Sequence, residues 1–142
     1  MNRNILAASL STVAVIALVI LGFVALGGPK KQRLRRSDLI KVQEIAKLAE
    51  QIQQTWRGST QGLPPNLDKF PESLKKDRAT NTLFNYRPKG GAQYEVCASF
   101  ATDSHGEPQS NVADMWLHPS GDYCFQFNAT QPVPQPPYFY DY

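Results

Sequence analysis

The chain has 142 residues, enough for one modest domain, and carries 15 basic against 12 acidic residues, a formal net charge of +3. The positive charge is not evenly spread, because residues 37–142 hold nine of the basic residues and all 12 acidic ones. A nucleic-acid-binding domain would carry a basic stripe on its folded surface. The composition therefore argues against nucleic acid as a partner.

An uncharged run of Leu, Ile, Val and Ala occupies residues 5–26. As a helix it would measure about 33 Å at 1.5 Å per residue, long enough for the roughly 30 Å hydrocarbon core of a bilayer. We therefore predict a transmembrane anchor over residues 1–28. A cleaved signal peptide is the alternative, although its apolar region is ordinarily about 7–15 residues long.

A basic juxtamembrane segment follows at residues 29–36, and its five basic side chains are Lys30, Lys31, Arg33, Arg35 and Arg36. Anionic headgroups attract such a cluster, so we predict that these side chains contact the bilayer surface. Pro29 is expected to break the helix, because proline has no N–H to donate. By the positive-inside rule alone, the segment would lie in the cytoplasm.

The two cysteines, Cys97 and Cys124, lie in segments that alternate polar and apolar residues with the period of a strand. In both segments the aromatic and aliphatic residues face one way and the cysteine faces the other. A bridge between the sulfurs would close a loop of about 28 residues, worth roughly 3.5 kcal/mol on the chain-entropy model. It would need an oxidising compartment, which places the domain outside the cytoplasm, against the charge rule. Two unpaired thiols in a cytosolic domain are the alternative.

After the basic segment, apolar residues recur at three- and four-residue steps from Leu39 to Trp56, typical of an amphipathic helix. Ser37 and Asp38 can cap its start, and Gly58 marks its end. Polar and charged residues between these positions, Lys41 and Glu44 among them, are expected to face water. The plain interpretation is one helix with an apolar face packed on a sheet.

Strand patterns occupy the second half of the chain. A turn at 63–67 and a short helical turn ending near residue 76 precede a first strand at 82–87 and a second at 93–100. Residues 115–118 and 122–127 predict a second hairpin. The expected fold class is α+β, an amphipathic helix on a small antiparallel sheet of three to four strands, spanning residues 37–127.

The tail, residues 128–142, is rich in proline and in aromatic residues. Its prolines favour polyproline II without strand pairing, and its aromatic side chains are costly to leave in water. The tail therefore packs back over its own domain, or docks on a partner through its last aromatic residues, or stays disordered. The residues of the second alternative are Tyr138, Phe139, Tyr140 and Tyr142.

Residues that could carry chemistry are few. His105 and His118 are the two histidines, and both are expected at the surface beside turns. Asp103, Glu107 and Asp114 flank a polar loop and offer the oxygen ligands that calcium prefers, but without the regular spacing of a known cage. No nucleophile elbow or phosphate-binding glycine pattern is present. We predict no enzymatic activity and no cofactor.

The order of segments resembles that of pilin-like and pseudopilin-like modules, which follow a single transmembrane helix in bacterial membrane proteins. The resemblance is carried by DLIKVQEIAKLAEQIQQTW, GLPPNL, TNTLFNYRPKGGAQYEVCASF and WLHPSGDYCF, and it covers roughly residues 37–127. It implies an extracytoplasmic helix-on-sheet domain with bonded cysteines and a structural role. Unlike true pilins, the chain has no acidic residue in its apolar run, which argues against fibre polymerisation.

The expected function follows from these features: a single-pass protein of the bacterial inner membrane, with its domain on the periplasmic side. It would act as an accessory subunit of an envelope or membrane complex, with the bilayer and other subunits as partners. The alternative is an extracytoplasmic ligand- or calcium-binding receptor module that uses the loop 102–114.

Overall fold

The computed structural model describes residues 3–26, 28–59, 62–105 and 114–137. The chain divides into two compact units, Met1–Arg33 and Leu34–Tyr142. The first unit contains the helix α1, Arg3–Leu26. The second contains most of the long helix α2, Pro29–Arg57, a single-turn helix α3, Glu72–Lys75, and all three strands.

The membrane span expected at residues 5–26 is wrong. Within the described part of the chain, no helix combines the length and the apolar character that a bilayer crossing requires. The same finding contradicts the expected single-pass anchoring in a bacterial inner membrane.

The amphipathic helix is confirmed, but it starts earlier than expected. The apolar helix α1 ends before Pro29, as expected, and Pro29 itself opens α2, because the N–H that proline lacks has no intrahelical partner in a first turn. Asp38 consequently lies inside the helix and is not its cap. The apolar stripe is fully buried, with Val42, Ile45, Leu48, Ala49 and Ile52 at 1% exposure or less.

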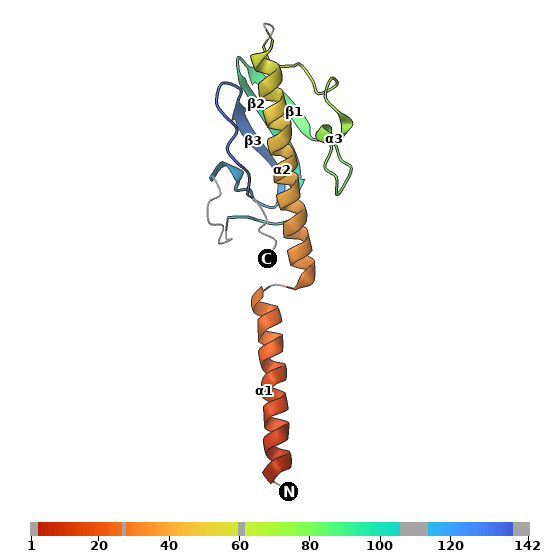
Figure 1. Cartoon of the computed structure of the whole chain (residues 1–142), viewed down its shortest axis with the longest axis vertical. Coiled ribbons are helices and arrows are strands. Elements are labelled where there is room, and N and C mark those ends of the chain that lie inside the picture. The colour runs from red at the N-terminus through yellow and green to blue at the C-terminus, as the bar shows by residue number, and fades with distance from the viewer. Residues whose placement is uncertain (1–2, 27, 60–61, 106–113, 138–142) are drawn as a thin grey trace. The chain divides into compact units, whose positions relative to one another are not determined.

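The sheet has three antiparallel strands in the order β1-β2-β3: β1 is Asn85–Gly90, β2 is Gln93–Phe100 and β3 is Gly121–Asn128. Helix α2 crosses one face of this sheet, as Figure 1 shows. We call the opposite face the outer face. Gly90 and Gly91 connect β1 to β2 with positive φ angles of 104° and 59°, which residues with side chains rarely adopt. The α+β class and the helix-on-sheet arrangement are thus confirmed.

The second hairpin is wrong. Residues Asp114–Trp116 form a turn of 3-10 helix, and β3 pairs with β2 along its whole length, from Gln93 opposite Asn128 to Phe100 opposite Gly121. Trp116 is 2% exposed and packs on Phe125 and Phe127, with ring centroids 5.2 and 5.8 Å apart. Burial of this ring in the core fixes the segment without any strand pairing.

The first strand also begins later than expected. Leu83 forms a single antiparallel bridge with Lys76, and Phe84 donates its N–H to the carbonyl of Lys75 at 2.8 Å. These residues therefore pair with the segment around α3 before β1 joins β2 at Asn85. The core between α2 and the sheet contains the aromatic residues that the strand alternation placed on the inner face: Tyr94, Phe100, Phe125 and Phe127.

Candidate functional site

The cysteines form a disulfide bond. Cys97 on β2 and Cys124 on β3 are direct cross-strand partners, with Cα atoms 3.9 Å apart and a sequence separation of 27 positions. Both sulfurs project from the outer face, since their neighbours Val96 and Phe125 point into the core. The prediction of a staple on the polar side of the sheet is confirmed.

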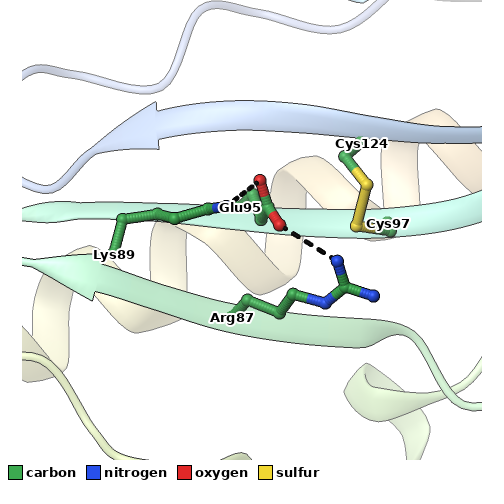
Figure 2. The surroundings of a disulfide bond; sticks show 5 residues. All are labelled: Arg87, Lys89, Glu95, Cys97 and Cys124. Carbon is green, nitrogen blue, oxygen red and sulfur yellow. Dashed lines mark hydrogen bonds and ion pairs between the residues drawn. A yellow bond between two sulfur atoms is a disulfide. The ribbon is translucent and has the colours of Figure 1, made fainter.

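Glu95 lies beside the bridge on the outer face, with basic residues of β1 around it (Figure 2). Its carboxylate pairs with Arg87 at 3.4 Å and with Lys89 at 3.0 Å. Glu95 is only 6% exposed, whereas the two basic side chains are about half exposed. The two cations and the neighbouring disulfide therefore shield one carboxylate from water, and the cluster carries a net charge of +1.

The carboxylate of Glu95 and the sulfurs of Cys97 and Cys124 lie within 4.8 Å of one another. Among the described residues, this is the group whose donor atoms are close enough to share a metal ion. In the disulfide, however, neither sulfur is a thiolate, which is the form that ligates metals. The geometry is that of a structural staple with a paired carboxylate.

The residues that we expected as candidate calcium ligands do not form a cluster in the part of the chain that the structure describes. Asp103 is exposed and accepts hydrogen bonds from the backbone N–H of His105 at 2.8 Å and from its ring Nδ1 at 2.9 Å. These bonds hold the pKa of Asp103 below its ordinary value. Asp114 opens the 3-10 turn, and Glu107 lies outside the described residues.

Among the described residues, no strand pairs with the edge of β1 that faces away from β2. Phe84 donates its N–H away from β2, to the carbonyl of Lys75. Because peptide groups alternate along a strand, the N–H and C=O of Tyr86 face the same way. Pro88 comes next in this alternation and has no N–H to offer. Within β1, a full pair of outward hydrogen bonds is therefore available at Tyr86.

A groove of about 490 Å³ lies beside this edge. We call it the edge groove; it is lined by residues 65–68, Glu72, Lys75, Lys76 and residues 83–86. Leu83 is 60% exposed in it. The hydroxyl of Tyr86 donates to the carbonyl of Pro64 at 2.9 Å, which ties the turn at 63–67 to the strand. The groove thus combines an exposed apolar side chain with free peptide groups.

Three of the four charged residues on the groove wall pair with one another, and the fourth is Asp68. Glu72 contacts Lys75 at 2.5 Å and Lys76 at 2.8 Å. Hydrogen bonds from Lys75 and then from Lys76 lower the pKa of Glu72 to about 2. These three residues leave one positive charge at the rim of the groove.

A buried ionic cluster under the sheet was missed by the sequence reasoning. Lys41 lies 3.4 Å from Asp77 and 3.8 Å from Asp38, and each of the three side chains is 8% exposed or less. Lys41 also donates to the carbonyl of Ser99. A cavity of about 110 Å³ lies beside Lys41 and Asp77. The cluster ties α2 to the end of β2 and to the loop before β1.

Both aspartates in this cluster are held by further hydrogen bonds. Asp38 accepts the N–H of Ala101 at 3.0 Å and both the N–H and the hydroxyl of Thr102 at 2.7 Å. Asp77 accepts the hydroxyl of Thr80 at 2.6 Å and the N–H of Ala79 at 2.9 Å. Burial acts to raise the pKa of Asp77, but these bonds and Lys41 outweigh it and lower the pKa.

His118 is buried, contrary to the expectation of a surface histidine. Its ring stacks on Phe100 with centroids 3.8 Å apart, and the residue is 2% exposed. Its backbone N–H donates to the hydroxyl oxygen of Ser104 at 2.8 Å, and its Nδ1 lies 3.1 Å from the carbonyl of Pro119. Burial lowers the pKa of His118. His118 thus ties the segment before β3 to Phe100 of β2 and to Ser104.

The tail packs back on its own domain as far as Pro137. Val133 contacts the core, and the indole N–H of Trp116 donates to the carbonyl of Pro134 at 3.2 Å. The aromatic residues expected to bind a partner, Tyr138, Phe139, Tyr140 and Tyr142, lie outside the described residues.

The basic residues of segment 29–36 lie in the first two turns of α2. Lys30, Lys31, Arg33 and Arg36 are exposed and Arg35 is half-buried. Their contact with lipid headgroups stays a prediction.

Comparison of the chain with protein-family models, with curated proteins and with solved structures gave no match.

Proposed function

We propose that the chain is a non-catalytic assembly module that binds another protein in an oxidising compartment outside the cytoplasm. The Cys97–Cys124 disulfide carries the proposal, because a bridge between neighbouring strands persists only where thiols are oxidised. The module would resemble pilin-like domains in its role as well as in its helix-on-sheet arrangement.

The bridge makes the sheet suitable for this role. By closing the loop between β2 and β3, it restricts the unfolded chain and stabilises the fold by about 3.5 kcal/mol on the chain-entropy model. A domain with a modest core gains rigidity from such a cross-link. A rigid sheet presents its edges in a fixed geometry, which lowers the entropic cost of binding.

The binding surface in this proposal is the edge groove, and its occupant is an extended segment of the partner. Such a segment would add to β1 as a fourth strand and exchange hydrogen bonds with Tyr86. The bridge between Lys76 and Leu83 supports this, because an antiparallel neighbour already pairs at the same edge. An apolar partner side chain would cover Leu83.

Photocrosslinking in the native host tests the proposal. A photoreactive residue in place of Leu83 should give one discrete cross-linked product, whereas the same residue in place of the exposed Asp122 on β3 should give none. Leu83→Asp should remove the complex without changing the melting temperature. No product from position 83 would exclude the edge groove as the binding surface.

Alkylation of thiols tests whether the protein resides in an oxidising compartment. If thiols are alkylated in intact cells before lysis, Cys97 and Cys124 should stay unlabelled and gain label only after reduction. Alkylation of both cysteines without reductant would exclude an oxidising compartment.

A further inference from the structure

The buried ionic cluster holds an amine directly against a carboxylate. The Nζ atom of Lys41 lies 3.4 Å from Oδ2 of Asp77, and both side chains are 8% exposed or less. A cavity of about 110 Å³ adjoins the pair and has room for a water molecule. An amine and a carboxyl group that are held together away from bulk water can condense to an amide.

The condensation balances within the chain itself. A new bond joins Nζ of Lys41 to Cγ of Asp77, one C–O bond of Asp77 breaks, and one water leaves. Two protons of the ammonium group go to the departing oxygen, and the positive and negative charges disappear together. The step therefore needs no oxidant, reductant or other reactant.

Proximity and burial both favour the amide. Two groups fixed side by side react as if each were present at about 10⁵–10⁸ M. A buried ion pair has lost the hydration of both charges, whereas an amide is neutral. Asp38, which lies 3.8 Å from the same Nζ, keeps three hydrogen bonds from Ala101 and Thr102 that do not involve Lys41.

Hydrogen-bond donors surround the carboxyl group that the amine would attack. Thr80 donates its hydroxyl to Oδ2 of Asp77 at 2.6 Å, and Ala79 donates its N–H to Oδ1 at 2.9 Å. Attack on Cγ produces a tetrahedral intermediate with negative charge on these oxygens. Donors already fixed in place stabilise such a charge.

Glu44 is placed to carry the protons. It follows Lys41 by three residues on the same face of α2, and its Oε2 accepts the N–H of Arg78, the residue after Asp77, at 3.2 Å. Burial raises the pKa of Glu44, although the N–H of Arg78 acts in the opposite direction. This carboxylate can therefore take a proton from the ammonium group and pass it to the leaving oxygen.

We propose that Lys41 and Asp77 become joined by an isopeptide bond that the folded chain forms by itself, with Glu44 as the proton carrier. The bond ties α2 to the segment before β1, as the disulfide ties β2 to β3. It forms once in each chain and is insensitive to reductants. The inference goes beyond the proposed assembly function and does not depend on it.

Mass spectrometry of the purified, full-length protein tests the proposal. After reduction of the disulfide, the wild type should weigh one water less than its polypeptide. A tryptic digest should contain a branched peptide that joins residues 37–47 to Asp77. An unchanged mass would overturn the proposal, as would a branch from Lys41 to Asp38 or a loss of water that persists in Lys41→Met.

Variants of two glutamates on α2 test the proton carrier. General acid–base catalysis contributes about 10²–10⁴-fold to a rate, so Glu44→Gln should slow the appearance of the branched peptide after cell-free synthesis by about 100-fold or more. Glu50→Gln, at an exposed position, should leave the rate unchanged, and melting curves show that both variants are folded. Equal rates in the wild type and Glu44→Gln would overturn the role of Glu44. The wild-type digest decides whether the bond exists even where a variant does not fold.

Discussion

Lys41 and Asp77 form an ion pair of 3.4 Å although they are 36 positions apart in the sequence, and both side chains are almost fully buried. One cation lies between two carboxylates, because Asp38 is 3.8 Å from the same ammonium group. A buried charge that loses its partner is costly. The stability of the domain therefore depends on this lysine.

Lys41→Met should lower the free energy of unfolding by about 3–5 kcal/mol, the usual cost of breaking a buried ion pair from one side. Urea denaturation measures the loss. Lys47→Met, one and a half turns further along α2 at an exposed position, should stay within about 0.5 kcal/mol of the wild type. Equal losses in the two variants would show that burial of Lys41 carries no special cost.

Replacement of both cysteines by serine should destabilise the domain by about 3.5 kcal/mol, since the unfolded chain regains the freedom of the closed loop. Wild-type protein reduced with a phosphine should unfold at nearly the same urea concentration as the double variant. If reduction left the midpoint unchanged, the bridge would contribute nothing to the fold.

His118 should make the domain less stable in mild acid. Burial lowers its pKa in the folded state, so the unfolded state binds the proton more readily, and stability is lost as the pH falls below about 6.5. His118→Gln should flatten the decline in urea midpoints between pH 7.5 and 5, whereas His105→Gln, at an exposed position, should preserve it. Burial raises the pKa of Glu44, which acts in the opposite direction, and comparison of the variants at each pH cancels that effect. Equal slopes in wild type and His118→Gln would contradict the assignment.

Tyr86 should make the domain less stable as the pH rises into the alkaline range. Burial raises its pKa to about 12, so the contribution of the neutral phenol is complete below about pH 10 and is lost as the pH rises toward 12. Tyr86→Phe should make the loss of stability in alkali smaller. Part of the loss should remain, because burial also raises the pKa of Tyr94.

The same substitution has an effect at neutral pH. It removes the hydrogen bond to Pro64 and should cost about 1 kcal/mol. Tyr123→Phe on β3 is the control for both measurements, and an unchanged alkaline profile in Tyr86→Phe would refute the prediction.

The periodic order of polar and apolar residues in the sequence was enough to predict β2 and the buried side of α2. The alternation from Tyr94 to Phe100 defines β2 with its observed bounds, and the apolar stripe from Val42 to Ile52 defines the buried side of α2. Because the inner faces follow directly from these periods, the outward position of Cys97 could be predicted too. Cys124 could be predicted as the partner of Cys97 because it lies in a second strand with the same alternation.

The buried polar residues could not be found in this way. Asp38, Lys41 and Glu44 read as a solvated helix face, because a charge in a helix usually lies in water. Their partners, Thr102, Asp77 and Arg78, come from distant loops whose positions have no periodic signal. The histidine at position 118 was misplaced for the same reason, since its burial depends on the ring of Phe100.

Pro88 limits the hydrogen bonds that the outer edge of β1 can offer. It follows Tyr86 in the outward alternation and has no N–H to donate, and the pairing of β1 with β2 shifts register directly after it. A proline and an irregularity at an edge strand are among the features by which proteins discourage uncontrolled strand addition, the process that leads open sheets toward amyloid.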